Sequence, residues 1–447
     1  MKYLLFLFSL ISLQAQTNPI ITSWMQNTTK VGSYYMKNNP TAISNNIIAN
    51  VQLVRYSANN VYVSTNGIPT YPTGPFQDGN PSQAQNQNGT FRFPLKAVKN
   101  AGTPVKTTMG NIGLFINGVA LFDARDGVSW SNAQQRVLGG PIMGKGDGVW
   151  NRDAIVAERV GFDCAKGHPA MGNYHHHQNP SSFKLDKTVI YDVCSLYDAD
   201  GLYTINPSVH SPLLGFAYDG FPIYGAYAYK NADGTGEIVR MKSGYMLRDI
   251  MSRTAYANGT DVTDGPAVGG NFPIGYFIED YMFTEHPGEA DYLDIHNGRF
   301  CVTPEYPQGT YAYFCTVDEN WNSAFPYAVG PTFYGSIVAA KVQTVNEAVE
   351  TYTATGVNEQ LELDKNAYSI FMHPDNDLLI IQSASINPQD ITITIFDIQG
   401  NQIADGVLKQ GSTIAHIDLQ LAYNGSYSVQ LSNGTKTIQQ ELIIKRK

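Results

Sequence analysis

Four of the nine histidines of this 447-residue chain lie within ten positions, in the segment 168–177. If residues 174–177 form a strand, successive side chains alternate between its faces, so His175 and His177 project from the same face. His168 precedes a turn that contains Pro and Gly, and it could fold back beside them. Imidazoles are ligands for zinc and copper, and a site with three protein ligands can keep one position open. We therefore predict that these three histidines bind one transition-metal ion, zinc or copper.

A possible fourth ligand comes from a later motif. His296 lies between two acidic residues, Asp291 and Asp294, and an Asn-Gly turn that would expose it, and the neighbouring carboxylates could orient its imidazole. Two weaker candidates are His210, which we expect to be structural at the start of a strand, and His286 in a loop. Taken singly, each of the three is more often an ordinary histidine with satisfied hydrogen bonds.

Other interpretations stay open at this stage. The histidines of the segment 168–177 could simply be polar residues on an exposed strand. The 28 tyrosines are expected mainly in the core, but exposed ones could stack on sugars, which would make the protein a non-catalytic glycan-binding or adhesion module. A metal-assisted hydrolase could use Asp219, Glu279 and Asp280 as acid or base, although nothing in the sequence places two of them at a working separation. The sequence assigns no catalytic residue and no reaction.

The elements that would position the histidines occur twice. Residues 112–122 align without a gap on residues 214–224. Both segments are apolar runs broken by Asn-Gly or Asp-Gly, the dipeptides that favour two-residue hairpin turns. We therefore expect two similar hairpins.

A second pair of segments repeats in the same order. Residues 172–177 follow Cys164 at the distance at which residues 309–314 follow Cys301. Together the two repeats predict a duplicated β unit. The second copy replaces the four histidines of the first by Glu305, Ala312, Tyr313 and Phe314. Any metal site is therefore expected in one half only.

The first fifteen residues predict export. They combine a positively charged start, an apolar run and a small-residue cleavage site after Ala15, which is the pattern of a secretory signal peptide. No later segment has the roughly 18 uninterrupted apolar residues of a transmembrane helix. An exported chain with four cysteines favours disulfides, and we expect Cys301 to pair with Cys315 and Cys164 with Cys194.

Composition and charge limit the class of protein. The 29 Lys and Arg against 38 Asp and Glu give a net charge of −9, which argues against nucleic acid or an anionic membrane as the main partner. Gly, Asn, Ser, Thr and aromatic residues are abundant, as in proteins made of strands and turns. We predict a mainly β protein, with an irregular hairpin-rich β domain that contains the duplicated unit and is followed by a small Ig-like β-sandwich.

The C-terminal eighty residues differ from the rest of the chain. Short β-rich runs alternate there with turn residues every 8–12 positions, which is typical of a sandwich. The predicted strands are residues 378–382, 391–397, 413–419, 426–431 and 439–444. A polar stretch without a clear period precedes them and predicts a linker. The expected organisation is a signal peptide (1–15), a β domain (16–340), a linker (341–367) and the sandwich (368–447).

This C-terminal region resembles the sorting domain that many cargo proteins of the type IX secretion system carry. The resembling segments are His373-Pro374-Asp375-Asn376, Asp397-Ile398-Gln399-Gly400, Ile417-Asp418-Leu419, Gly425-Ser426-Tyr427 and Ile443-Ile444-Lys445-Arg446-Lys447. Family members usually show Pro-Asn-Pro where this chain has His-Pro-Asp. The resemblance implies the type IX secretion machinery as a partner, and a secreted or outer-surface location.

The region from about residue 50 to 340 resembles the YHYH-domain proteins. The resembling segments are His168-Pro169, residues 172–177, residues 210–225 and residues 293–299. The Tyr-His-Tyr-His that names the family stands here as Tyr174-His175-His176-His177, so both motif histidines are kept and the second tyrosine is replaced. The family has no settled activity, so the resemblance implies a domain without implying a reaction.

Overall fold

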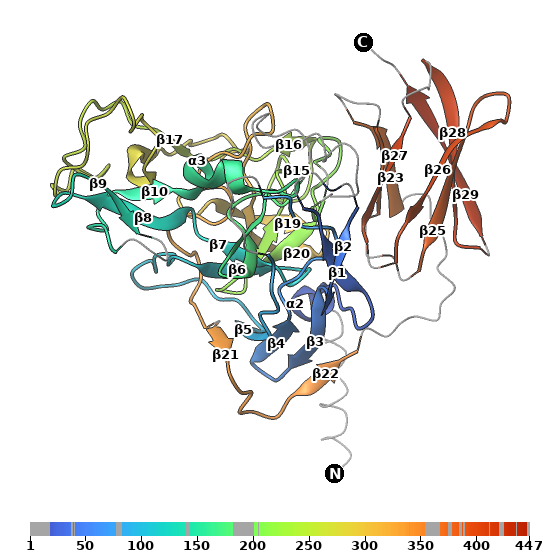
Figure 1. Cartoon of the computed structure of the whole chain (residues 1–447), viewed down its shortest axis with the longest axis horizontal. Helices are drawn as coiled ribbons and strands as arrows, with labels where there is room; N and C mark the ends of the chain where they lie inside the picture. The colour runs from blue at the N-terminus through green and yellow to red at the C-terminus, as the bar shows by residue number, and fades with distance from the viewer. Residues whose placement is uncertain are drawn as a thin grey trace.

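The structure is a computed structural model. It describes residues 18–444 except 37–38, 40, 77–82, 140–143, 182–200, 204, 339, 354–366, 374–377, 384–386, 388, 411, 420–423 and 435. Figure 1 shows a large β-rich part formed by the N-terminal three quarters of the chain, and a separate pair of small sheets, drawn in red, formed by the C-terminal residues. The predicted signal peptide lies outside the described residues.

Helices are few and short, whereas strands run through the whole described chain. The helices are α2 (Pro19–Thr22), α3 (Ala154–Glu158), η1 (Arg159–Gly161) and η3 (Ile278–Asp280). The strands of the large part are β1 (Val31–Tyr34), β2 (Ile43–Ile48), β3 (Val51–Tyr56), β4 (Asn60–Thr65), β5 (Gly89–Pro94), β6 (Asn111–Phe115), β7 (Ala120–Phe122), β8 (Arg125–Ser131), β9 (Arg136–Gly139), β10 (Asn151–Asp153), β11 (His168–Ala170), β12 (Asn173–His176), β13 (Leu213–Ala217), β14 (Pro222–Tyr224), β15 (Tyr227–Tyr229), β16 (Ile238–Arg240), β17 (Tyr245–Leu247), β18 (Tyr281–Phe283), β19 (Gly298–Thr303), β20 (Tyr306–Phe314), β21 (Ala340–Val342) and β22 (Glu350–Tyr352). The strands of the small part are β23 (Tyr368–Met372), β24 (Leu378–Ser383), β25 (Ile391–Phe396), β26 (Gln402–Leu408), β27 (Ile414–Asp418), β28 (Gly425–Ser432) and β29 (Thr437–Ile444).

The central element is an eight-stranded sheet in the order β11-β12-β7-β6-β13-β14-β20-β19. This order is symmetric about the β6–β13 pair. Each half contains one of the two predicted hairpins, β6–β7 or β13–β14, and a second hairpin that lies parallel to it, β11–β12 or β19–β20. At the centre, Leu114 lies opposite Phe216, and these are the residues that the gap-free alignment equates. The two halves therefore share one topology, as the predicted duplication requires.

The duplication needs one correction to the predicted alignment. His176 pairs with Leu121 as Tyr313 pairs with Ile223, so β12 and β20 correspond as predicted. On the preceding strand, however, His168 lies opposite His175, whereas Arg299 lies opposite Ala312.

The counterpart of His168 is therefore Arg299, not Glu305. The β11–β12 hairpin closes at Ala170–Asn173, whereas the β19–β20 hairpin extends to Thr303–Tyr306. Because the second hairpin is longer, residues at the same distance from Cys164 and from Cys301 do not occupy equivalent places on the strands β11 and β19.

Both faces of the eight-stranded sheet are buried, because another layer covers each one. On one face, Leu114 and Phe216 pack against Val63 and Phe93 of a second sheet, ordered β21-β5-β4-β3-β22. On the other face, sheet residues that include Phe115, Ile223 and Tyr313 pack against residues of loops, such as Phe333. The histidine segment thus lies at the end of a well-packed sheet.

Part of the segment predicted as a linker belongs to the large part. β21 pairs with β5, and β22 pairs with β3, so residues 340–352 form both edges of the five-stranded sheet. Edge strands are often short and polar, because one side of their backbone faces solvent. Such strands lack the alternating apolar pattern that would have revealed them in the sequence. Residues 354–366 of the predicted linker lie outside the described residues.

The small part is the predicted β-sandwich. Its two sheets have the orders β23-β24-β27 and β26-β25-β28-β29. Alternate residues of facing strands, including Leu379, Ile381, Ile393 and Val429, form one apolar core. The predicted strands at 378–382, 391–397, 413–419, 426–431 and 439–444 match β24, β25, β27, β28 and β29, and the sequence pattern missed β23 and β26.

The predicted Cys301–Cys315 disulfide is wrong. Both cysteines are free and buried. The hairpin register places Cys301 opposite Thr310, five residues before Cys315, and five extended residues span roughly 16 Å. A disulfide needs Cα atoms about 4.4–6.8 Å apart. The other predicted pair involves Cys194, which lies outside the described residues, so that pairing stays a prediction.

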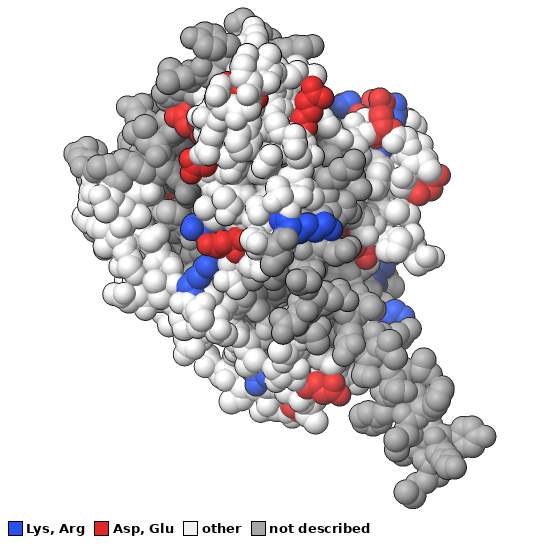
Figure 2. Space-filling model, turned by 90° about the vertical axis from the view of Figure 1, so that its right-hand side faces the viewer, with Lys and Arg blue, Asp and Glu red and all other residues white. Residues whose placement is uncertain are grey.

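Charges are scattered over the face that contains the sandwich. Figure 2 shows Lys and Arg on this face as separate groups, with Asp, Glu and uncharged residues between them. The described part of the face therefore presents no continuous basic patch. Within the described residues, no helix has both the length and the apolar character needed to cross a membrane.

Candidate metal site

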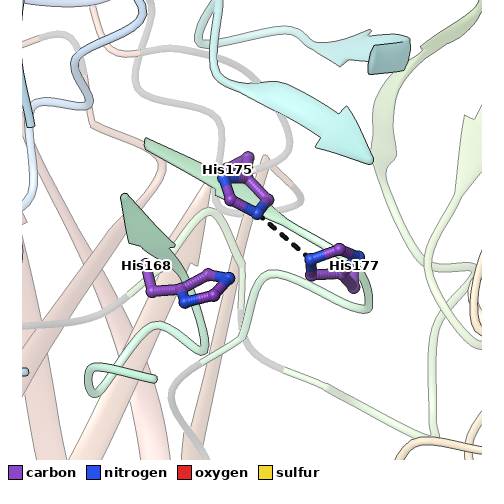
Figure 3. A group of neighbouring side chains, drawn as sticks. All are labelled: His168, His175 and His177. Atoms are coloured by element: carbon purple, nitrogen blue, oxygen red, sulfur yellow. Dashed lines mark hydrogen bonds between the residues drawn. The ribbon is translucent and has the colours of Figure 1, made fainter. Parts of the chain in front are cut away.

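The histidine cluster (His168, His175 and His177) is the focus of the candidate site. One ring nitrogen from each imidazole lies within 4.8 Å of the others. Figure 3 shows the three rings directed toward a common point, with the Nε2 atoms of His175 and His177 3.1 Å apart. All three side chains are buried, with exposed fractions of 6%, 1% and 3%. The structure thus brings together the three ligands predicted from strand alternation and a turn.

A tight hairpin produces this convergence. His168 in β11 lies opposite His175 in β12, and the turn between them is Met171-Gly172. Both turn residues have positive φ, 50° and 83°, as in the two-residue turns that suit the twist of a hairpin. His177 follows β12 and shares the face of His175, whereas the ring of His176, on the other face, contacts Tyr71. The alternation predicted for this segment is confirmed.

Backbone hydrogen bonds orient two of the rings. The Nδ1–H of His175 donates to the carbonyl oxygen of Asn173 at 2.9 Å, and the Nδ1–H of His177 donates to that of Asp123 at 2.6 Å. With the proton on Nδ1, each Nε2 has a free lone pair directed into the cluster. Metal-binding histidines in proteins are usually oriented in this way.

A carboxylate that the sequence analysis did not select completes the site. Oε2 of Glu158 lies 3.3 Å from Nε2 of His168 and 3.3 Å from Nε2 of His177. Glu158 is the last residue of α3, and Asp153 caps the start of that helix by accepting hydrogen bonds from the backbone of Ile155 and Val156. Asp153 also accepts a hydrogen bond from Tyr327, which fixes the helix against a distant loop. Glu158 is half-buried, with 27% of its side chain exposed, so the site reaches solvent on this side.

The electrostatics of the cluster follow from burial and from the neighbouring charges. Burial, together with the charges of His168 and His177, holds the pKa of His175 well below its usual range. Burial alone would lower the pKa of His177, but the adjacent Glu158 outweighs it, so the pKa of His177 is raised. Burial alone would raise the pKa of Glu158, but the imidazoles of His168 and His177 outweigh it, so the pKa of Glu158 is lowered.

Aromatic rings enclose the cluster. Phe122 stacks on His175 with ring centres 3.7 Å apart, and it meets His177 edge-on. Phe162 meets His168 edge-on, with ring centres 4.9 Å apart. These apolar walls lower the local dielectric and strengthen any interaction of the imidazoles with a cation.

His296 is not brought to this cluster. Its Nδ1 contacts the hydroxyl and the carbonyl oxygen of Thr332, and its ring packs against Tyr334. His210 precedes β13 and lies beside Tyr224 and Phe314 of the second half of the sheet, where the structural role expected for it fits. His286 stacks on Tyr292 away from the cluster.

The carboxylates considered for a hydrolase serve the fold. Asp219 accepts hydrogen bonds from Tyr313 and from the backbone of Gly335. Asp280 forms a fully buried ion pair with Arg253, with an N–O distance of 2.7 Å. Glu279 accepts hydrogen bonds from the backbone and the side chain of Asn151. The partners of all three groups are therefore structural.

The repeated tyrosines lie in the core. Tyr224, Tyr311 and Tyr313 are fully or almost fully buried, and their rings pack against other aromatic residues within the eight-stranded sheet. Tyr227 and Tyr229 are half-buried. The core role expected for these residues accounts for their positions.

Taken together, the molecule is a β-rich protein with a mirrored eight-stranded sheet, a buried histidine cluster at one end of that sheet, and a C-terminal sandwich. Residues 90–326, more than half of the chain, match the family described as YHYH protein. The chain belongs to this family. The family match includes all three histidines of the cluster and also Glu158.

The C-terminal sandwich matches a second, separate family. Residues 369–445 match the secretion system C-terminal sorting domain. The protein is therefore exported through type IX secretion to the cell surface or beyond it.

Comparisons with individual proteins add little. No curated protein matches the chain. One similar solved structure is described as "Biofilm associated protein - BSP domain". It is 16% identical, the match covers 29% of this chain and 22% of that chain, and the TM-score is 0.16. A likeness at that TM-score carries no argument about fold or function.

Proposed function

We propose that this protein binds a transition-metal ion, zinc or copper, on the outside of the cell. The ligands are the three imidazoles of the histidine cluster and the carboxylate of Glu158. The observation that carries the proposal is the separation of the ligand atoms. In a tetrahedral site with bonds of about 2.0–2.1 Å, neighbouring ligand atoms lie about 3.3 Å apart. Three of the six separations are 3.1, 3.3 and 3.3 Å, and the ligand nitrogens of the three imidazoles all lie within 4.8 Å of one another.

The chemistry of these atoms also supports a cation. The Nε2 atoms of His175 and His177 face each other although both Nδ1 atoms already donate to backbone carbonyls. Two lone pairs at 3.1 Å repel unless a proton or a metal ion lies between them. In addition, the carboxylate oxygen Oε2 of Glu158 lies 3.3 Å from Nε2 of His168 and 3.3 Å from Nε2 of His177, so a negative charge borders the same small space. One cation in that space would be attracted by the carboxylate and by the imidazole nitrogens together.

Three nitrogen ligands and one oxygen ligand suit both zinc and copper. Copper(II) binds most nitrogen and oxygen sites more tightly than zinc, so the natural metal depends on its supply as well as on the site. The residues themselves hold the ion, fix the ring tautomers and exclude water from the buried side.

Metal content of the full-length protein tests the proposal. The chain is purified without a His-tag, and zinc and copper per chain are measured after dialysis. We expect about one ion per wild-type chain and a loss of most of it in the double variant His175→Ala/His177→Ala. His210→Ala is the matched control, because it removes a half-buried histidine that lies beside the second half of the same sheet, and it should keep the metal. A wild-type chain with no more metal than the double variant would end the proposal.

We also propose how the chain leaves the cytoplasm. A signal peptide of residues 1–15 directs its export, and the signal peptide is cleaved after Ala15. N-terminal sequencing of the secreted protein should then begin at Gln16.

We further propose a disulfide between Cys164 and Cys194. Peptide mapping without reduction would detect it.

A further inference from the structure

The entry to β11 contains a buried carboxylate with four hydrogen bonds. Oδ1 of Asp163 accepts from the backbone N–H groups of Ala165 and Gly167, both at 3.0 Å. Oδ2 accepts from the hydroxyl of Tyr174 at 2.8 Å and from the N–H of Gly74 at 2.9 Å. Asp163 has no exposed surface. One carboxylate thus fixes the turn that leads into β11 and also holds the neighbouring strand β12.

The second half of the sheet contains the same arrangement. Oδ1 of Asp294 accepts from the N–H groups of His296 and Gly298 at 2.9 and 3.2 Å, and from the hydroxyl of Tyr311 at 2.8 Å. Tyr311 corresponds to Tyr174 in the duplicated unit.

The backbone of the two turns agrees in detail. Lys166 and Asn297, at matching positions, have φ values of 61° and 64°. A Cβ on the following residue, Gly167 or Gly298, would overlap the hydroxyl of the bonded tyrosine. The same turn geometry is therefore kept in both halves.

The two Asp–Tyr pairs differ in what they position. In the first half, Asp163 precedes His168 by five residues, and Tyr174 directly precedes His175. In the second half, the matching positions hold Arg299 and Ala312. The guanidinium of Arg299 donates to the carbonyl oxygens of Tyr229, Lys230 and Ala290.

We infer that Asp163 is a positioning residue for the metal ligands, because its bond to Tyr174 sets the register between the two strands that carry His168 and His175. The inference rests on the metal-binding function proposed above. The Asp163–Tyr174 bond lies on the face of β12 opposite to the imidazoles, so it acts on the ligands only through the backbone. Outer residues that orient metal ligands typically contribute about 10–100-fold to metal affinity.

The duplication supplies the control for the test. Zinc dissociation constants of the full chain are measured by competition with a chromophoric chelator, for Asp163→Asn and Tyr174→Phe and for their counterparts Asp294→Asn and Tyr311→Phe. We expect the first pair to lower zinc affinity about 10–100-fold and the second pair to change it less than about twofold. Metal-free unfolding temperatures should fall by similar amounts in Tyr174→Phe and Tyr311→Phe, because each variant loses one hydrogen bond from a buried tyrosine hydroxyl to an aspartate.

The outcomes separate the inference from the proposed function. Wild-type affinity in both Asp163→Asn and Tyr174→Phe would overturn the inference, and so would an equal loss in the variants of the second half. If Asp163→Asn does not fold, Tyr174→Phe against Tyr311→Phe decides alone, because only a hydroxyl is removed. A wild-type chain that binds no metal would instead overturn the proposed function.

Discussion

The Nε2 atoms of His175 and His177 lie 3.1 Å apart, although the other nitrogen of each ring already donates to a backbone carbonyl oxygen. The two residues are two positions apart in the sequence and share one face, and the backbone bonds fix the direction in which each ring presents its lone pair. Glu158 and His168 close the remaining sides of the same small space. The predictions below follow from this arrangement.

Removal of the carboxylate should weaken metal binding. Glu158→Gln keeps the size of the side chain but removes its charge, and loss of a direct ligand should lower zinc affinity at least about 100-fold, more than loss of an outer residue. Equilibrium competition with a chelator measures the change. Glu305→Gln is the control, because it alters a half-buried carboxylate bonded to Tyr224 in the second half of the sheet. Equal affinities in wild type and Glu158→Gln would remove Glu158 from the ligand set.

Metal should stabilise the large part of the protein and leave the sandwich unchanged. An ion that binds only the folded state contributes about 2.7 kcal/mol at a free concentration 100 times its Kd. For a domain of roughly 330 residues, an unfolding entropy of about 2.1 cal/mol/K per residue makes this a rise of roughly 4 °C in Tm. Calorimetry with and without zinc, and again after a chelator, would show the shift. The ligands all lie outside the sandwich core, so a similar shift in the transition of the sandwich would contradict the site.

Metal binding should weaken as the pH falls. The raised pKa of His177 means that a proton competes with the metal at and below neutral pH, and the proton must leave when the metal binds. Glu158→Gln removes a ligand as well as this charge, so the weaker metal binding should move the pH midpoint of metal loss upward. Zinc retention measured between pH 5 and 8 tests both statements.

The metal-free protein should show the opposite trend. A group whose folded pKa is raised stabilises the fold below its unfolded pKa, which is about 6.5 for histidine, and this contribution is lost as the pH rises through the folded value. The lowered pKa of Glu158 adds stability above its unfolded pKa of about 4.3. The pair therefore stabilises metal-free protein mainly between about pH 4.3 and 6.5. A Tm of metal-free wild type that falls less than that of Glu158→Gln between pH 6 and 8 would contradict this account.

The buried ion pair of Asp280 and Arg253 should matter for stability and not for metal. Both side chains have no exposed surface, so Asp280→Asn leaves a buried guanidinium without its counter-charge, at a cost of about 3–5 kcal/mol. The exposed pair of Lys230 and Glu237 gives the comparison, since Glu237→Gln should cost less than about 1 kcal/mol. Denaturant unfolding and metal content of both variants would be measured. A loss of metal in folded Asp280→Asn would show a coupling that the structure does not contain.

The sequence predicted those parts of the site that depend on residues close together in the chain, and it missed those that depend on contacts between distant residues. Alternation along one strand is a property of consecutive residues, so it placed His175 and His177 on one face without any tertiary information. The turn after His168 is also local, and it correctly brought that residue back. Glu158, in contrast, is the last residue of a five-residue helix, and the cap of that helix, Asp153, is held by Tyr327, which is distant in sequence.

The duplicated unit shows the same contrast between local features, which the sequence predicted, and relationships between distant residues, which it did not. The hairpins aligned correctly because each is formed by its own turn, whereas His168 was matched to Glu305 instead of Arg299 because hairpin length is not visible in the spacing of cysteines. The predicted disulfide between Cys301 and Cys315 failed for a related reason, since the register of the hairpin separates them.

By itself, the sequence determined the β character, the C-terminal sorting domain and its sandwich, the repeated hairpins and the common face of two histidines. All of these are set by patterns within a few residues or by composition. Only the tertiary structure decided that Glu158 and not His296 lies beside the histidines, that Arg299 occupies the place of His168 in the second half, and that residues 340–352 complete a sheet. These depend on which distant segments pack together, and that packing is fixed by the burial of apolar faces over the whole chain and not by any local pattern.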